Sequence, residues 1–195
     1  MPQEIHRALL ARSDLRPRFI RAEKLIQTCT TLAAAFALSA LLSFPAPSGD
    51  SATAGRASVI DGDTIEIHGE RIRLNGIDAP ESRQLCRDSS GKEYRCGQAA
   101  ALALDDYLAA SRPTRCVEVD RDRYRRIVAD CFRADGANVA AWLVRHGHAL
   151  DWPRYSKGRY ADDQQTARQG KVGIWRGLFI EPWEWRRGKR LPVSG

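Results

Sequence analysis

Two aspartates and a glutamate lie close together in the stretch from residue 59 to 81, VIDGDTIEIHGERIRLNGIDAPE. They are Asp63, Asp78 and Glu81, and the two aspartates border runs of alternating apolar residues. Carboxylates at the rim of an apolar sheet are costly in free energy unless another group pairs them. A hard divalent cation takes oxygen ligands from carboxylates, backbone carbonyls and water, so it is the simplest partner for this set.

The same residues also fit a purely structural role. The sequences DGD and DAPE are good turn formers, because Asp and Gly favour turns and Pro fixes φ. Arg73 favours a chemical role, since it lies close in sequence to all three acids and its guanidinium fork matches phosphate oxygens bidentately. Together these residues could hold a metal ion and a phosphate in one place.

The element that carries the acids is predicted to be a β-hairpin. Apolar residues recur at every second position in the runs 64–68 and 71–77. Gly69-Glu70 lies between the runs, and a Gly that leads a two-residue loop favours a type II′ turn.

Alternation along the hairpin decides on which face each side chain lies. Asp63 and Asp78 share the parity of the apolar residues in their runs, so both should leave the hairpin on its buried face, at one end. Strict alternation places Arg73 on the opposite face from Asp78. A shared site therefore requires a bulge or bend, which we predict at Asn75-Gly76.

Three sequence blocks resemble those of the staphylococcal nuclease-like, or thermonuclease, family. They are VIDGDT, RIRLNGIDAPE and the later DRYRR, which occur in that order at the family's usual separations, and the likeness covers about residues 57–175. The resemblance implies an α+β fold in which a five-stranded OB-fold barrel carries about three packed helices. It also implies a calcium-dependent phosphodiesterase site on the rim of the barrel.

By position, the resemblance assigns roles to individual residues. Asp63 and Asp78 match the calcium-binding aspartates, and Ala79 matches the residue that lends a backbone carbonyl. Glu81 matches the glutamate that orients or deprotonates the attacking water. The other matches are the phosphate-gripping arginines Arg73 and Arg126, the nearby acid Asp61, and Asp122 and Tyr124 at the tip of a later hairpin.

Two positions depart from the family pattern. Arg125 stands where the family usually has Gly, and strain of about 1 kcal/mol would follow if this position has φ > 0. Pro153 replaces one of two tyrosines of the family's nucleotide pocket, whereas Tyr155 matches the other. Stacking on an aromatic ring contributes about 1 to 3 kcal/mol per base, so the loss of one ring should weaken or loosen nucleotide selection. Tyr124 and Tyr155 are the remaining candidates for nucleotide binding. The alternative is that Tyr155 packs a loop with Trp152.

Residues 1–54 have the composition of an export signal. Six Lys and Arg residues precede Leu32–Phe44, an uncharged run of Leu, Ala, Phe and Ser, and Ala52-Thr53-Ala54 offers small residues for cleavage. The run is shorter than the ~20 residues that span a bilayer. We predict cleavage after Ala54 and a periplasmic or secreted protein. The long basic segment leaves an uncleaved membrane anchor as an alternative.

Four cysteines follow the predicted leader, an even number that favours disulfides in an exported chain. We expect Cys86 to pair with Cys96, and Cys116 with Cys131, because residues 116–131 form a predicted hairpin whose ends face each other. A zinc site is the competing interpretation, but the sequence has no CxxC pair and no His at ligand spacing.

The rest of the chain divides into a domain and a tail. Residues 55–176 are predicted to form the nuclease-like domain, with helices over 97–111, 137–146 and 160–175. Residues 177–195 form a Trp-rich basic tail. Its aromatic residues could bind a polyanion or a membrane surface, or could fold back on the domain.

The net charge of +7 favours polyanionic partners without identifying one. Together with the candidate site, the family resemblance implies a Ca²⁺-dependent nuclease that hydrolyses DNA or RNA, single strands foremost, with little sequence preference, and we expect it to be a monomer. We expect replacement of Glu81 or Arg73 by Ala to remove most activity without unfolding the protein. The alternative is an exported accessory or binding protein with little catalysis, since the ending PWEWR is similar to that of relatives assigned to succinoglycan biosynthesis.

Overall fold

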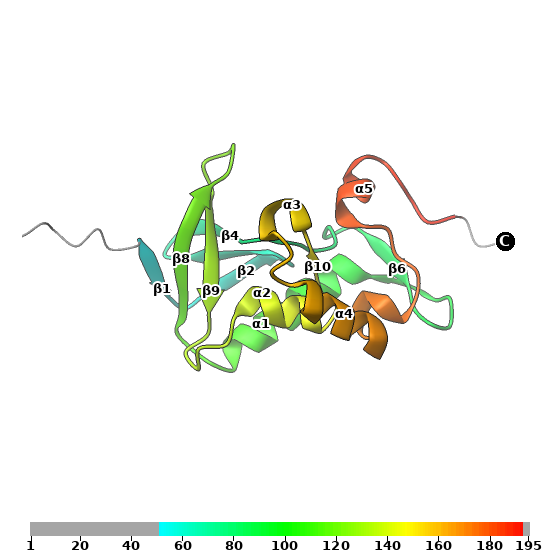
Figure 1. The fold of residues 1–195 in the computed structure, drawn as a ribbon, viewed down its shortest axis with the longest axis horizontal. Helices are drawn as coiled ribbons and strands as arrows, with labels where there is room; N and C mark the ends of the chain where they lie inside the picture. The colour runs from blue at the N-terminus through cyan, green and yellow to red at the C-terminus, as the bar shows by residue number, and fades with distance from the viewer. Residues whose placement is uncertain (1–50, 193–195) are drawn as a thin grey trace, which may run out of the picture. The chain divides into compact units, whose positions relative to one another are not determined.

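A curled, six-stranded sheet is the central element of the computed structural model, which describes residues 51–192 (Figure 1). The strand order is β1-β8-β9-β4-β3-β2, in which β4 and β9 run parallel and the other neighbours antiparallel. The strands are β1 (Ala52–Gly55), β2 (Ser58–Asp61), β3 (Thr64–Ile67), β4 (Glu70–Leu74), β8 (Thr114–Arg121) and β9 (Ile127–Phe132). The predicted α+β class with an OB-type sheet is confirmed, and β1 adds an edge strand to the five expected.

The predicted export signal falls mainly on residues 1–50, which lie outside the described part of the chain. Its last residues are described, because β1 begins at Ala52 and pairs with β8 in the register Ala52↔Val117. Cleavage after Ala54 would therefore remove most of this strand. Within the described range, no helix is long and apolar enough to cross a membrane.

The hairpin of β3 and β4 forms as predicted, but its turn differs. Ile67 pairs with Glu70, so the loop residues are His68 and Gly69 rather than Gly69-Glu70. Both have positive φ, 54° and 82°, which defines a type I′ turn and not the expected type II′. The physical reason is that Glu70 continues the strand, which leaves Gly69 in the second central position of the turn.

Two small sheets and six helical segments complete the described chain. One sheet joins β5 (Ile77–Asp78) to β10 (Leu150–Asp151), and the other joins β6 (Leu85–Arg87) to β7 (Glu93–Arg95). The helices are α1 (Cys96–Ala109), α2 (Val139–Arg145), α3 (Pro153–Ser156), α4 (Ala161–Gly170), the 3-10 helix η1 (Gly173–Arg176) and α5 (Pro182–Arg186).

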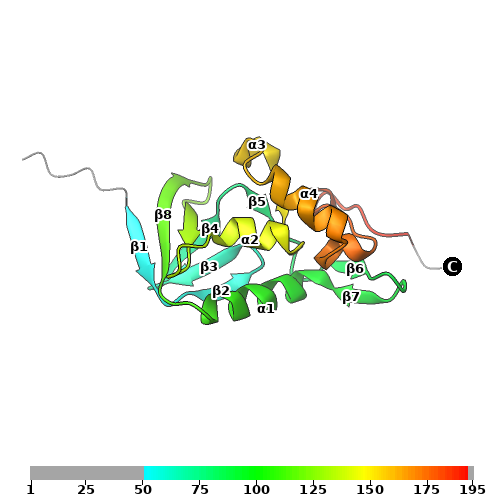
Figure 2. The ribbon, with the colours of Figure 1, turned by 60° about the horizontal axis from the view of Figure 1, so that its bottom comes forward.

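The main hydrophobic core lies between the sheet and its first two long helices. Ile65 and Leu74 from the sheet, Leu104 from α1 and Leu143 from α2 are all buried in it. Helix α1 packs along β2, and α2 packs against β9 and α4 (Figure 2). The side chain of Asn138 caps α2 by accepting a hydrogen bond from the backbone of Ala141, at 2.9 Å.

The helix predicted over residues 160–175 is two shorter segments. Helix α4 ends at Gly170 because Lys171 adopts a left-handed conformation, and η1 begins only at Gly173. Gly173 also has a positive φ of 55°, which interrupts the helix a second time, and a Cβ atom there would overlap the backbone of His146 and Gly147, so this close approach requires Gly.

Both predicted disulfides are confirmed. Cys86 bonds to Cys96, with their Cα atoms 5.6 Å apart, and this bond ties β6 to the start of α1. Cys116 bonds to Cys131, its direct partner in the β8–β9 register. The zinc alternative is therefore wrong for these four cysteines.

The C-terminal segment folds back on the domain. Leu178 and Arg87 exchange backbone hydrogen bonds at 2.8 and 3.0 Å, and the Gln84 side chain donates to the Ile180 carbonyl oxygen at 2.6 Å. Trp183 of α5 packs against a second small core that includes the Cys86–Cys96 disulfide. Figure 1 shows α5 above β6, and the ring centroid of Trp183 in α5 lies 6.2 Å from that of Trp152, the residue before α3.

Candidate active site

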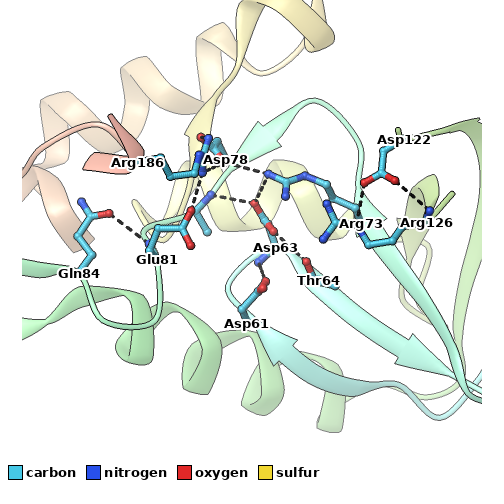
Figure 3. Close-up of polar contacts among 11 residues, drawn as sticks. Asp61, Asp63, Thr64, Arg73, Asp78, Glu81, Gln84, Asp122, Arg126 and Arg186 are labelled. Carbon is cyan, nitrogen blue, oxygen red and sulfur yellow. Dashed lines mark hydrogen bonds and ion pairs between the residues drawn. The ribbon is translucent and has the colours of Figure 1, made fainter. Parts of the chain in front are cut away.

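Asp63 and Asp78 meet at the guanidinium group of Arg73 (Figure 3). Nη2 of Arg73 donates hydrogen bonds to Asp63 Oδ2 and to Asp78 Oδ1, both at 2.9 Å. Asp63 precedes β3, Arg73 lies near the end of β4 and Asp78 lies in β5. Residues that strict alternation separated are thus in direct contact.

A bend between β4 and β5 makes this contact possible, and it lies at Asn75-Gly76 as predicted. Gly76 has φ of 78°, and its carbonyl oxygen accepts a hydrogen bond from the Trp152 amide at 2.9 Å. A Cβ atom at this position would lie 3.0 Å from Ser156 Cα, so the approach of α3 also favours Gly. The bend carries Asp78 out of the main sheet and turns it toward Arg73.

Asp63 is buried and held by several donors. Its Oδ1 accepts from the Thr64 hydroxyl at 3.0 Å and its Oδ2 from the Ala79 amide at 3.2 Å, in addition to Arg73. Burial raises the pKa of Asp63 to about 7, although Arg73 acts in the opposite direction. The Asp61 side chain accepts a hydrogen bond from the Asp63 amide at 3.1 Å.

Asp78 is fully buried, with 0% of its side chain exposed, and it contacts a second arginine that sequence reasoning missed. Arg186 of α5 donates to both Asp78 oxygens, at 3.1 and 2.6 Å. It also donates to Glu81 Oε1 at 2.7 Å. Burial raises the pKa of Asp78, and the hydrogen bond from Arg186 works against that rise.

Two neighbours position the backbone of Glu81. The side-chain oxygen of Gln84 accepts a hydrogen bond from the Glu81 backbone amide at 3.2 Å, and the backbone amide of Gln84 donates one to the Glu81 carbonyl oxygen at 2.7 Å. Gly97 in the first turn of α1 packs against that same carbonyl, where no Cβ atom would fit. The side chain of Glu81 remains partly exposed and reaches Arg186.

Arg126 lies at the base of the β8–β9 tip, on the same side of Asp78 as Arg73 in Figure 3. Its Nε donates to Asp122 Oδ2 at 2.7 Å, and Asp122 Oδ1 accepts from the amides of Tyr124 and Arg126 at 2.9 Å. Burial works to raise the pKa of Asp122, but these hydrogen bonds outweigh it and the pKa is lowered. Arg125 has φ of 65°, the left-handed conformation that the family's Gly would adopt freely.

The two tyrosines named as nucleotide-binding candidates are exposed and lie on different elements. Tyr124 is 65% exposed, and the guanidinium carbon of Arg123 lies 4.7 Å from its ring centroid. Tyr155 is 52% exposed and contacts Trp152 edge to face, with centroids 4.4 Å apart. Neither ring is buried in the core, so both can be reached by a ligand.

The acids of the site fit a hard cation in donor type and in charge. When ionised, the three acids carry three negative charges, whereas Arg73 and Arg186 carry two positive ones. The pKa values of Asp63 and Asp78 are raised because the arginines only partly offset the cost of burying a charged carboxylate. In the described residues, however, no group of three or more His, Cys, Asp or Glu side chains is arranged around a metal position. The two arginines take up the carboxylate oxygens instead.

The curled OB-type sheet, with arginines and carboxylates gathered beside it, places the chain in the class of α+β proteins built on this barrel fold. The model of the staphylococcal nuclease homologue family matches residues 71–177, and the chain belongs to this family. The match contains Arg73, Asp78, Glu81 and Arg126. Asp63 precedes it, and Arg186 follows it.

Three relatives illustrate the range of proteins that are similar to this chain. The succinoglycan biosynthesis protein ExoI of Rhizobium meliloti is 58% identical over 122 residues, which is 63% of this chain and 64% of the relative. An uncharacterized endonuclease of Escherichia coli is 35% identical over 67% of this chain and 82% of its own length. The staphylococcal-like nuclease CAN1 of Arabidopsis thaliana is 35% identical over 62% of this chain, but only 34% of the plant protein is matched.

Arg186 could not have been found from local sequence patterns. It lies 105 residues from Glu81 in the chain, in a basic run that is also typical of a solvated tail. The one available signal was indirect. Three acids close to a single arginine leave negative charge uncompensated, which a bound cation or a further basic side chain would balance.

Proposed function

We propose that the protein is a calcium-dependent nuclease that hydrolyses phosphodiester bonds in single-stranded DNA or RNA with little sequence preference. The observation that carries the proposal is the contact of Arg73 with both Asp63 and Asp78, next to Glu81. Membership of the staphylococcal nuclease homologue family and relatives named as nucleases support it.

The arginines act on the phosphate. Guanidinium groups bind phosphate oxygens bidentately and stabilise the negative charge that develops in the transition state. Arg73 is fixed in direction by two buried aspartates, whereas Arg126 is held by Asp122 at the β8–β9 tip. A scissile phosphate gripped by both would lie beside the acids.

Glu81 acts as the general base. Its carboxylate would accept a proton from the water that attacks phosphorus, a role that needs a partly exposed group within reach of that water. Asp63, Asp78 and the carbonyl of Ala79 would hold calcium, which polarises a phosphate oxygen and lowers the pKa of bound water. With two protein carboxylates as ligands, we expect a modest affinity that substrate and water ligands complete.

The basic tip and exposed aromatic rings fit a single-stranded polynucleotide. A surface hollow lies beside the β8–β9 tip, and its lining includes Arg71, Arg121, Arg125, Arg126 and the exposed Tyr124. Positive charge tracks the backbone of a strand, while aromatic rings stack on bases without much preference for sequence. The two disulfides fit an oxidising compartment, so we also propose that the protein acts outside the cytoplasm.

Labelled single-stranded DNA, RNA and duplex DNA of one sequence test this proposal. We expect the purified protein to cut the single strands in millimolar calcium and to stop when a chelator is added in excess. Cleavage that is unaffected by the chelator would contradict the calcium requirement, and no cleavage of any of the three would contradict nuclease activity.

A second candidate is an accessory role in polysaccharide synthesis with little catalysis. Similarity to a relative named for succinoglycan biosynthesis favours it, as does the engagement of Glu81 and Asp78 by Arg186. A calcium titration in parallel with the cleavage assay separates the two, because calcium binding without turnover favours the accessory role.

A further inference from the structure

Arg186 is placed at the centre of the acidic site by a segment outside the family match. Its guanidinium group donates three hydrogen bonds, two to Asp78 and one to Glu81, at 2.6 to 3.1 Å. A planar fork that pairs with one carboxylate and reaches a second is a strong, charge-assisted arrangement. The pKa of Arg186 is raised: burial works to lower it, but the hydrogen bonds to both acids outweigh burial.

The oxygens that Arg186 binds are the ones that a divalent cation would need. Asp78 Oδ1 already accepts from Arg73 and Arg186, and Asp78 Oδ2 accepts from Arg186. Calcium binds carboxylate oxygens at about 2.3 to 2.6 Å, so a cation at Asp78 would compete for the same lone pairs and repel the adjacent guanidinium. Both cannot engage Asp78 fully at one time.

We propose that Arg186 acts as an internal counter-cation that occupies the carboxylate oxygens of Asp78 and Glu81, and that a divalent cation must displace it to occupy the site. This inference rests on the proposed calcium site. It assigns a regulatory contact to the C-terminal segment: the site is held closed while the cation is absent, and the closed form lowers the apparent calcium affinity.

The anchoring of α5 fits such a displacement. The segment is fastened upstream, at Leu178 and Ile180, by hydrogen bonds to Arg87 and Gln84. Arg186 is the last residue of α5 and its side chain is 36% exposed, so its side chain can leave Asp78 while those anchors stay in place.

The ring of Trp152 lies beside Arg186 and can serve as a fluorescent probe of its displacement. The guanidinium carbon of Arg186 lies 5.6 Å from the centroid of this ring, and Trp183 of α5 lies nearly parallel to it with centroids 6.2 Å apart. Displacement of Arg186 changes the surroundings of Trp152, so tryptophan fluorescence should change when calcium binds.

Calorimetric titration with calcium chloride tests the inference without reference to activity. The apparent dissociation constant equals the intrinsic constant divided by the open fraction, so removal of the competitor tightens binding by the inverse of that fraction. We expect Arg186→Ala to bind calcium about tenfold or more tightly than wild type, and Arg186→Lys to lie between them, since Lys is a point charge without the fork. Arg187→Ala is the matched control, because Arg187 is 74% exposed and pairs with Glu184.

Fluorescence and thermal melting provide independent measurements. Calcium should change the tryptophan fluorescence of wild type and of Arg187→Ala, but much less that of Arg186→Ala. Without calcium Arg186→Ala should melt below wild type, because Asp78 loses a buried partner, and calcium should restore more of its stability than it adds to wild type. If Arg186→Ala does not fold, Arg186→Lys serves for all three measurements.

The outcomes separate this inference from the proposed function. Tighter calcium binding in Arg186→Ala, or in Arg186→Lys when that variant replaces it, supports the inference. Equal or weaker binding than wild type overturns it and leaves the calcium site standing. Absence of calcium binding in wild type and in every variant overturns the calcium site itself, and the inference with it.

Discussion

One nitrogen of Arg73 contacts two buried aspartates, and this shared contact makes the residue structural as well as chemical. Asp63 and Asp78 are 6% and 0% exposed at their side chains. Loss of a partner from a buried ion pair costs about 3 to 5 kcal/mol because a charge is left uncompensated. Glu81 differs, since its side chain is 36% exposed. We therefore keep the prediction that Glu81 can be truncated without unfolding, and revise it for Arg73, whose truncation we expect to destabilise the fold.

Glu81→Gln should lower the cleavage rate by about 100-fold or more with little change in stability, because a general base contributes roughly 10² to 10⁴ in rate. Steady-state cleavage of a labelled oligonucleotide and a thermal melt check the two halves of this prediction. Glu66→Gln is the control, as Glu66 pairs only loosely with Arg71, at 3.8 Å. A Glu81→Gln enzyme as fast as the Glu66→Gln control would contradict the role of Glu81.

Arg73→Ala should lower both activity and the free energy of unfolding, the latter by about 3 kcal/mol, because both aspartates lose a donor. Urea denaturation monitored by circular dichroism measures the change. Calcium should recover part of the lost stability, since it would compensate the same carboxylates. An unchanged urea midpoint would show that the buried pair is not stabilised by Arg73.

At the scale of elements, the site depends on how β5 and the following loop leave the sheet. The bend at Gly76 turns Asp78 toward Arg73, and the first turn of α1 packs against the backbone of the loop that carries Glu81 and so fixes its position. Gly97 allows the helix to touch the carbonyl of Glu81 directly. Catalytic geometry is sensitive to such packing, because displacement by about 1 Å can cost 10²-fold in rate.

Gly97→Ala tests this packing. Ala usually stabilises a helix relative to Gly by roughly 1 kcal/mol, but here its Cβ atom would overlap the Glu81 backbone. We expect a less stable protein with a cleavage rate reduced at least tenfold, measured by thermal melting and the oligonucleotide assay. Gly170→Ala in α4 is the control, because a Cβ atom there meets only Val172 Cγ1 at 3.6 Å. Equal behaviour of the two variants would exclude the close contact.

At the scale of the whole molecule, sequence patterns predicted what is local. Alternation predicted the hairpin and the buried face of both aspartates, and cross-strand spacing predicted the Cys116–Cys131 bond. The approach of Arg186 to Glu81 joins residues 105 positions apart, and no local period records such a contact. The type I′ turn was missed for a related reason, since pairing across the hairpin, and not the turn residues alone, fixes the register.

The pH dependence of stability is also a property of the whole fold. Burial lowers the pKa of His148 from 6.5 to about 4, and His146 and Arg176 add to the effect. The unfolded chain therefore binds the proton of this residue more readily between these values, so the contribution of His148 to the free energy of unfolding falls as pH drops through this window and is fully retained above about pH 6.5.

His148→Phe should remove part of this acid sensitivity, on the order of 1 kcal/mol, while the aromatic contact with Trp142 is kept. Urea midpoints of wild type and variant between pH 4 and 7 measure the difference. The two curves should run parallel above about pH 6.5 and diverge toward acid. Parallel curves over the whole range would contradict an unprotonated His148 in the fold.

The most direct measurement is the cleavage of one labelled single-stranded oligonucleotide by the wild type and by Glu81→Gln, in millimolar calcium and in excess chelator. We expect the wild type to cut the strand only in calcium, and Glu81→Gln to retain at most about 1% of that rate. An intact strand after incubation with wild type and calcium, or equal cleavage by the two proteins, would contradict this expectation.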